Sequence, residues 1–271
     1  LRLMRSSEIE SIAVSLLYSF VNPEHERKIG LALEELGIPV SLSSEIMPEY
    51  REFERTSTTS INAYLAPVMS QYLGRLESKI SGSPLRVMQS NGGAIKARVA
   101  MASPVRTILS GPAGGVVGAF FLAQKTGYSN IITFDMGGTS TDVSLCDEEV
   151  RVTHESEVAG MPIGIPMMDI HTVGAGGGSI AQVDKGGALR VGPESAGANP
   201  GPICYGKGDA LTVTDANVIL GRLLPRFFLG GTMPLAENRI PEVLNLLGWV
   251  DKWPSPERLA QGVIDVVNNN M

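Results

Sequence analysis

The sequence predicts an α/β protein in which a mixed sheet is flanked by helices. Short apolar runs rich in β-branched residues alternate with segments of helical periodicity in the first half of the chain. Glycines gather at 111–118, 137–138 and 174–178, which is typical of tight turns and close backbone approach. The last third is dominated by helical periodicity, and no repeat of fixed period occurs.

The first 48 residues predict a β-α-β unit. Residues 11–20 form an apolar run consistent with a buried strand, and Asn22 with Pro23 is typical of a helix start. The helix is expected to stop at Gly37, before a second strand at 39–43. Because the chain begins with Leu1 and ends within a helical pattern, we interpret it as a fragment. Residues 1–48 would close a truncated first domain, and 49–271 would form a second domain, truncated at its C-terminus.

A long helix is predicted over residues 55–80, and Pro67 should kink or divide it. Its apolar face would consist of Ile61, Leu65, Val68, Tyr72 and Leu76. Beyond it the sequence predicts strands at 85–89 and 130–135, a turn at 90–93, a helix at 112–125, short strands up to 191, an ordered loop at 192–209, and helices at 213–223, 240–247 and 256–269.

Composition and charge exclude some classes of function. The net charge of −6 argues against a nucleic-acid-binding protein, which usually presents a basic surface. The longest apolar runs, at 12–18 and 116–123, are too short to span a bilayer, and residues 1–10 lack the features of a signal peptide. Two cysteines favour a reducing compartment, so we expect a cytoplasmic protein without nucleic-acid or membrane partners.

The strongest functional signal is the segment FDMGGTSTDVS at residues 134–144. An apolar strand is followed by the turn residues Gly137 and Gly138, which can adopt positive φ and let backbone N–H groups approach phosphate oxygens. Hydroxyl groups that can donate to the same oxygens belong to Thr139, Ser140 and Thr141. The sequence therefore predicts a phosphate-binding β-hairpin. The alternative is a plain hairpin with a Gly-Gly turn.

Two carboxylates frame this hairpin. Asp135 and Asp142 lie near its mouth, where a carboxylate can hold Mg²⁺ through water or orient a nucleophile. We therefore expect ATP and Mg²⁺ as ligands, and Asp135 also as a catalytic residue. No Walker A loop occurs, and the GxG pattern at 174–176 lacks the context of a dinucleotide site.

The hairpin segment resembles the second phosphate motif of the actin-like ATPases. Nearly the whole chain is similar to the hydantoinase A / 5-oxoprolinase family, which includes the A-type component of N-methylhydantoinase. Eight segments carry this resemblance in the same order: NPEHERKIG, ERTSTTSINAYLAPVM, VMQSNGG, PVRTILSGPAGGVVGA, FDMGGTSTDVS, MDIHTVGAGGGSIA, GPESAGANPGPICYG and TVTDANVILGRL.

The resemblance implies a ribonuclease H-like (actin-like ATPase) domain and an ATP-dependent enzyme that works with a B-type hydantoinase subunit. We expect a hydrolase subunit that opens a cyclic amide of the hydantoin, N-methylhydantoin or 5-oxoproline type. The alternatives are a carboxylase subunit of the acetone carboxylase type and a non-enzymatic ATPase module. The family's first phosphate loop has no counterpart here, since no second DxGGTxTD occurs, so we expect the isolated fragment to have weak or no ATPase activity.

A second candidate site lies in the segment MDIH. Asp169 and His171 alternate with apolar residues, so on one strand they would share a face beside the glycines at 174–178. Such a pair suits metal binding or general acid–base catalysis, and it equally suits a hydrogen-bonded brace for the loop. Both interpretations stay open.

The remaining motifs favour structural roles. Residues 110–115 open a helix in which Gly114 and Gly118, spaced by four, favour close packing against the sheet, and a phosphate contact by its N-terminal N–H groups is the alternative. Residues 91–93 favour a turn. Thr214 or Asp215 is expected to cap a helix, with a site role for Asp215 and Asn217 as the alternative. Cys204 lacks a nearby base and is not a candidate nucleophile.

Overall fold

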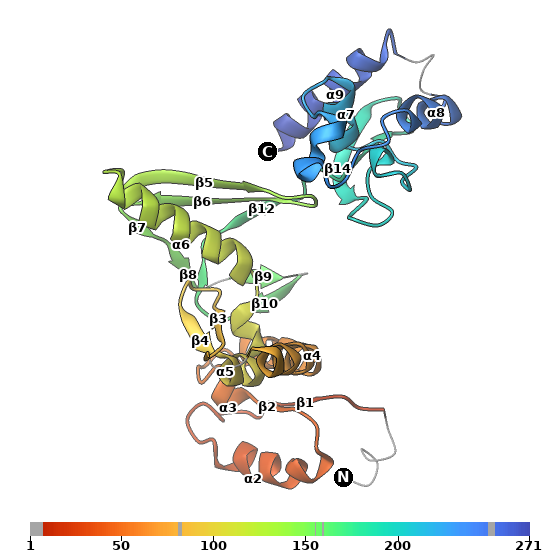
Figure 1. Ribbon diagram of the computed structural model, residues 1–271. Helices are drawn as coiled ribbons and strands as arrows, with labels where there is room; N and C mark the ends of the chain where they lie inside the picture. Colours follow the sequence, from red (N-terminus) through yellow and green to blue (C-terminus); the bar gives the residue numbers. More distant parts are fainter. Residues whose placement is uncertain (1–7, 81–82, 155, 159, 249–252) are drawn as a thin grey trace. The chain divides into compact units, whose positions relative to one another are not determined.

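The computed structural model describes residues 8–80, 83–154, 156–158, 160–248 and 253–271 (Figure 1). Most of the segment 1–10, in which no signal peptide is expected, lies outside them. The chain divides into two compact units, the first formed by Leu1–Ile131 and Leu145–Ile170 and the second by Ile132–Ser144 and His171–Met271. The predicted domain boundary between residues 48 and 49 stays a prediction.

The predicted β-α-β unit is confirmed at the start of the first unit. Strand β1 (Ile12–Val14) pairs in parallel with β2 (Val40–Leu42), and helix α2 (Glu24–Leu33) with the 3-10 turn η1 (Glu34–Leu36) connects them. Gly37 ends this connection in the left-handed conformation, with φ of 66°. Val14, Leu33 and Leu42 form a small core between the helix and the strands.

The long helix α4 (Glu52–Lys79) follows the short helix α3 (Ser43–Ile46). Pro67 lies inside α4, which continues as one helix, so Pro67 does not divide it and the predicted kink stays a prediction. The predicted apolar face is also wrong in part, because Val68 and Tyr72 are 69% and 59% exposed. Much of the buried face is polar, and its Arg55, Thr58, Thr59 and Asn62 side chains form hydrogen bonds. The buried residues are Arg55, Thr58, Thr59, Ile61, Asn62, Ala63, Ala66 and Leu73.

Small hairpins and helices complete the first unit. Strands β3 (Arg86–Met88) and β4 (Ala94–Lys96) are antiparallel across the predicted turn, and α5 (Ala97–Ala102), the 3-10 turn η2 (Pro104–Thr107) and α6 (Ser110–Lys125) follow. The sequence did not reveal β4 or α5. The later strands are β7 (Glu149–Val150), β8 (Val152–Thr153), β9 (Ser156–Val158), β10 (Met161–Ile163) and β11 (Met167–Met168).

The second unit includes the turn of a hairpin and the adjoining strand residues, Ile132–Ser144. Strands β5 (Asn130–Met136) and β6 (Thr141–Asp147) share a four-stranded sheet with β7 and β12 (His171–Val173), and β12 is antiparallel to β6. The hairpin of β13 (Ser179–Val183) and β14 (Leu189–Ser195) follows, then the 3-10 turn η3 (Ile203–Tyr205) inside the predicted loop.

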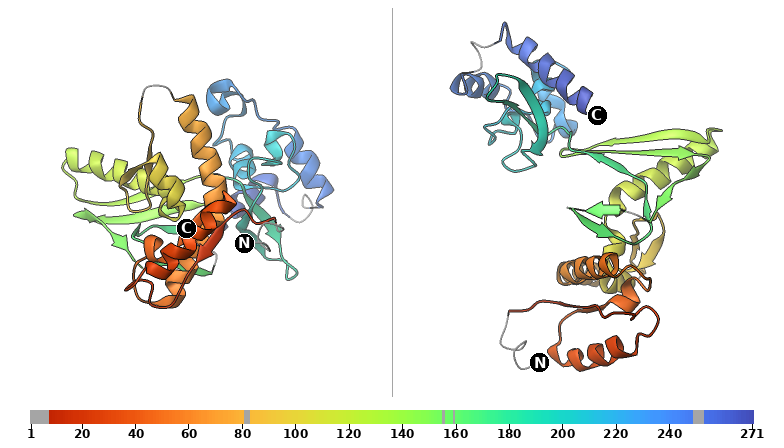
Figure 2. Two further views of the ribbon diagram at one scale, coloured as in Figure 1. Left: turned by 90° about the horizontal axis from the view of Figure 1, so that it is seen from below. Right: turned by 180° about the vertical axis from the view of Figure 1, so that it is seen from behind.

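Helices then dominate, as predicted. They are α7 (Val213–Ile219), the 3-10 segment η4 (Pro225–Gly231), α8 (Arg239–Leu246) and α9 (Pro256–Asn270). Figure 2 shows α9 alongside the β13–β14 hairpin, and α9 also contacts α7. The core of this unit lies between these elements and includes Ile203, Leu211, Val213, Val263 and Val267.

The α/β class is confirmed. The described strands form several small sheets instead of one continuous mixed sheet, because most have only two or three residues before a turn. Within the described residues, no helix is both long enough and apolar enough to cross a bilayer.

Candidate functional site

The hairpin turn, residues 137–140, joins β5 to β6 in the second unit. The N–H of Gly137 donates to the carbonyl of Ser140 over 2.9 Å, and farther along the hairpin the Thr133 hydroxyl lies 3.2 Å from the Ser144 nitrogen. Both contacts fit one antiparallel register, which places Asp135 opposite Asp142. Directly opposite residues have Cβ atoms about 4.5–5.5 Å apart, so the two carboxylates are neighbours on one face of the sheet.

The carbonyl groups of the turn are occupied by the glycine-rich segment, residues 174–178. The N–H of Gly177 donates to the Gly137 carbonyl over 3.0 Å, and the N–H of Gly178 to the Gly138 carbonyl over 2.6 Å. The C=O and N–H of one trans peptide point in opposite directions. The N–H groups of Gly138 and Thr139 therefore point away from the glycine-rich segment.

These N–H groups are available to a ligand. In the part of the chain that the structure describes, no acceptor lies within hydrogen-bonding reach of the N–H groups of Gly138, Thr139 and Ser140. Gly138 and Thr139 are exposed, and Ser140 is half-buried. Successive N–H groups without internal partners form a concavity that suits an anion. The backbone N–H groups of the turn can therefore donate hydrogen bonds to phosphate oxygens.

Glycine is needed here for space. Neither Gly137 nor Gly138 has positive φ, so that part of the prediction is wrong. The tight contact lies at Gly176, where a Cβ would be 2.8 Å from the Gly137 carbonyl oxygen and from backbone atoms of Gly138 and Thr139. A side chain at position 176 would displace the turn.

Helix α7 supports the glycine-rich segment. The N–H and the hydroxyl of Thr214 both donate to the Gly177 carbonyl over 2.8 Å. The Ser179 hydroxyl accepts from the N–H of Gly176, also over 2.8 Å. The turn is thus fixed by the glycine-rich segment, and that segment is fixed by the first turn of α7.

The structure gives the predicted hydroxyl residues different roles. Thr139 and Ser140 lie on the turn itself. Thr141 is fully buried, and its hydroxyl donates to the Ala175 carbonyl over 2.6 Å. In this structure its proton is therefore directed into the protein, and the direct phosphate contact expected of Thr141 from sequence stays a prediction.

The two predicted magnesium ligands lie in a polar row. Asp142 faces Asp135 on one side and Thr172 on the other, and the Thr172 hydroxyl donates to Oδ1 of Asp142 over 2.6 Å. Among the described residues, no group of three or more His, Cys, Asp or Glu side chains is arranged to hold a metal ion. A carboxylate pair nevertheless fits Mg²⁺, which keeps several waters and completes its shell with phosphate oxygens.

The second candidate pair is separated by the structure. Asp169 follows β11 and His171 opens β12, so the prediction that one strand carries both is wrong. His171 pairs with Val143, the neighbour of Asp142 on β6. Because side chains alternate across a strand, His171 lies on the face opposite to Asp142. Thr172, which sequence reasoning passed over, takes the place beside the carboxylate. The catalytic roles of Asp169 and His171 stay predictions.

Asp215 has a structural role. Thr212 caps α7 and forms a capping box with Asp215, so the predicted cap is displaced by two or three residues. The buried Asp215 carboxylate also accepts from the N–H groups of Ile203 and Cys204. Burial, together with the charge of Asp215, raises the pKa of the Cys204 thiol. A thiol held protonated is a poor nucleophile, which agrees with the prediction for Cys204.

Two further predicted structural motifs are the turn at residues 91–93 and the glycines of α6. The 91–93 turn is confirmed, because the N–H of Gln89 donates to the Gly93 carbonyl over 2.7 Å. A Cβ at Gly114 would meet the Met88 side chain only at 3.7 Å, and one at Gly118 would meet no described atom within 4 Å. Packing inside the first unit therefore gives no steric reason for these two glycines.

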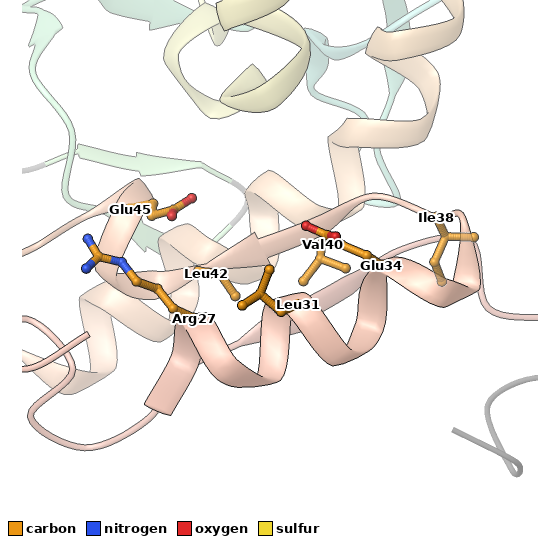
Figure 3. Close-up of a pocket in the computed structure, with 8 residues that line it drawn as sticks. Arg27, Leu31, Glu34, Ile38, Val40, Leu42 and Glu45 are labelled. Carbon is orange, nitrogen blue, oxygen red and sulfur yellow. The ribbon is translucent and has the colours of Figure 1, made fainter. Parts of the chain in front are cut away.

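The first unit also contains an open pocket of about 460 Å³ between α2 and β2 (Figure 3). Leu31, Val40 and Leu42 give it an apolar floor, and Arg27 with Glu34 and Glu45 give it a charged rim. None of the residues predicted to bind ATP lines this pocket.

Comparison with known proteins assigns the chain to a family. The family model described as hydantoinase/oxoprolinase matches residues 55–271, which is most of the chain. The chain belongs to the hydantoinase/oxoprolinase family, as the sequence motifs predicted.

Two curated relatives and two solved structures illustrate the family. The alpha subunit of caprolactamase from Pseudomonas jessenii is 40% identical over 98% of this chain and 40% of its own length. The 5-oxoprolinase of Saccharomyces cerevisiae is 44% identical over 84% of this chain and 18% of its own. An acetone carboxylase solved without nucleotide matches with a TM-score of 0.83 and 32% identity, over 99% of this chain and 39% of its own.

The ATP-dependent caprolactamase from Pseudomonas jessenii matches with a TM-score of 0.75 and 39% identity, over 99% of this chain and 40% of its own. The chain therefore spans about two fifths or less of the length of these relatives.

Proposed function

We propose that this chain contributes phosphate-binding machinery to an ATP-dependent hydrolase that opens a cyclic amide of the hydantoin, N-methylhydantoin or 5-oxoproline type. The observation that carries the proposal is the hairpin turn beside two opposed carboxylates, in which the N–H groups of Gly138 and Thr139 face away from the glycine-rich segment. The family supplies the reaction class, because its relatives include a 5-oxoprolinase and an ATP-dependent caprolactamase.

In this proposal the turn binds the phosphates of ATP. The N–H groups of Gly138, Thr139 and Ser140 donate to phosphate oxygens, and the hydroxyls of Thr139 and Ser140 add further donors. Asp135 and Asp142 would hold Mg²⁺ together with water, and Asp135 would also orient the attacking group. When bound, the ion would supply neutralisation of charge on the phosphate oxygens.

The chemical purpose of ATP is activation. An amide oxygen is a poor leaving group, whereas phosphate is a good one. Transfer of the terminal phosphoryl group of ATP to the carbonyl oxygen would release ADP and make the ring carbon electrophilic. Water would add to this carbon, the ring C–N bond would break as the nitrogen takes up a proton, and hydrolysis of the resulting acyl phosphate would release the carboxylate and inorganic phosphate. Asp169 and His171 are proposed as the acid–base pair of the hydrolysis.

The proposal also covers the type of domain, the cellular compartment and the partner subunit. The hairpin and its neighbours would be the second phosphate motif of a ribonuclease H-like, actin-like ATPase domain in a cytoplasmic protein. Two relatives, named as the alpha subunit of caprolactamase and the gamma subunit of acetophenone carboxylase, support assembly with another subunit, which we propose to be of the B type.

The test uses the full-length protein together with its partner. ATP hydrolysis is measured with hydantoin, N-methylhydantoin, 5-oxoproline, caprolactam, or acetone with bicarbonate, and ring-opened products are followed by mass spectrometry. We expect one cyclic amide to stimulate ATP hydrolysis and to be opened in proportion. Absence of stimulation by every compound would contradict an enzymatic role and favour a non-enzymatic ATPase module.

A carboxylase subunit is the second candidate. It is favoured by the acetone carboxylase structure, which matches with a TM-score of 0.83. Stimulation by acetone with bicarbonate, without opening of any cyclic amide, would replace the first proposal by this one.

A further inference from the structure

A row of three polar side chains crosses the sheet of the second unit. Asp135 on β5, Asp142 on β6 and Thr172 on β12 occupy facing positions, so their side chains lie on the same face. Within the row, the Thr172 hydroxyl donates to Oδ1 of Asp142 over 2.6 Å. This length is typical of a strong hydrogen bond from a hydroxyl to a carboxylate.

The bond constrains the carboxylate. Asp142 is half-buried, and a side chain with access to solvent samples several rotamers unless a contact selects one. Because Thr172 engages Oδ1, the carboxylate plane is fixed and Oδ2 is left for another ligand. Without a cation, Asp135 and Asp142 face each other as like charges, which is unfavourable. Thr172 therefore holds Asp142 in place against this repulsion.

We propose that Thr172 is a positioning residue that holds Asp142 in the orientation required to bind the nucleotide's Mg²⁺. The inference rests on the proposed nucleotide site. Thr172 acts only through the carboxylate, so it matters for the metal-dependent part of nucleotide binding. Its hydroxyl is the active group, and its methyl group has no part in the effect.

The experiment compares two substitutions with opposite expectations in the full-length protein. Thr172→Val keeps the shape and strand preference but removes the hydroxyl, whereas Thr172→Ser keeps the hydroxyl and removes the methyl group. Dissociation constants for a non-hydrolysable ATP analogue are measured with Mn²⁺ and with EDTA. Thr133→Val is the matched control, because the Thr133 hydroxyl bonds to the Ser144 backbone and not to a carboxylate.

In wild type, Mn²⁺ should strengthen binding of the analogue. The strengthening is the ratio of the dissociation constant in EDTA to that with Mn²⁺. We expect Thr172→Val to lower this ratio about tenfold, the effect of losing one hydrogen bond to a charged group. Binding in EDTA should be unchanged, and Thr172→Ser and Thr133→Val should stay within about twofold of wild type.

The outcomes distinguish a failure of the proposed nucleotide site from a failure of the proposed positioning role of Thr172. If wild type does not bind the analogue, the nucleotide site itself is wrong. If wild type binds with metal dependence but Thr172→Val behaves identically, the positioning role is wrong. It is also wrong if Thr172→Ser loses as much as Thr172→Val, or if Thr172→Val weakens binding equally in EDTA.

Discussion

Gly176 packs so tightly against Gly137 that a Cβ at position 176 would lie 2.8 Å from the Gly137 carbonyl oxygen. Two hydrogen bonds from the glycine-rich segment to the carbonyls of Gly137 and Gly138 accompany this contact. The shape of the hairpin turn therefore depends on a segment more than thirty residues farther along the chain. The direction of the N–H groups of the turn depends on it as well.

Gly176→Ala should displace the turn and lower ATP turnover by about 10- to 100-fold, because a small shift of a binding group has large kinetic effects. The loss should appear in both nucleotide affinity and turnover. Gly118→Ala is the control, since a Cβ there meets no described atom within 4 Å. Wild-type turnover in a folded Gly176→Ala variant would show that the turn does not need this support.

Asp215→Ala should lower the free energy of unfolding by about 3 kcal/mol, because it leaves several buried donors without an acceptor. These donors are the N–H groups of Ile203, Cys204 and Thr212 and the Thr212 hydroxyl. Urea denaturation measures the change. An effect below about 0.5 kcal/mol, typical of surface substitutions, would mean that Asp215 does not anchor this part of the second unit.

Glu26 should make stability depend on pH. Burial of its carboxyl group is the largest single influence and opposes ionisation, but hydrogen bonds from Ser44, Ser43 and Leu16 together outweigh it. The pKa of Glu26 therefore lies below its ordinary value of 4.5. Because the pKa is lower in the folded state, Glu26 stabilises the protein above pH 4.5, and this stabilisation is lost as the pH falls through the folded-state pKa.

Glu26→Gln tests this expectation. The substitution should lower the unfolding temperature at pH 7 and should flatten its dependence on pH below 4.5. The control is Glu24→Gln, because Glu24 is exposed and forms an ion pair with Lys28 on the surface of α2. Equal pH profiles for wild type and Glu26→Gln would contradict the assignment.

The sequence predicted local structure where one pattern determined it. The β-α-β unit followed from apolar runs and a glycine stop, and the hairpin from a Gly-Gly turn between two strands. The buried face of α4 could not be predicted in the same way. Asn62 can be buried because its side-chain amide bonds to the Ser41 hydroxyl, the Ala102 carbonyl and the Val105 N–H, all more than twenty residues away in sequence. Distant partners decide such burial.

In the candidate site too, the sequence could not predict contacts between residues that are distant in the chain. FDMGGTSTDVS indicated the turn and its two carboxylates, since those residues are adjacent in sequence. Thr172 could not be identified, because its place beside Asp142 depends on the register between β6 and β12. The break between β11 and β12 likewise invalidated the assumption that Asp169 and His171 share one strand.

The most direct test of the central claim is ATP hydrolysis by the full-length protein carrying Asp135→Ala. Asp135 is exposed, so its replacement should leave the fold intact. Asp147→Ala, at an exposed position on the adjacent strand β6, is the control. We predict a fall in ATP turnover by about two orders of magnitude for Asp135→Ala and none for the control. Unchanged turnover in Asp135→Ala would contradict the assignment of this hairpin as part of the ATP site.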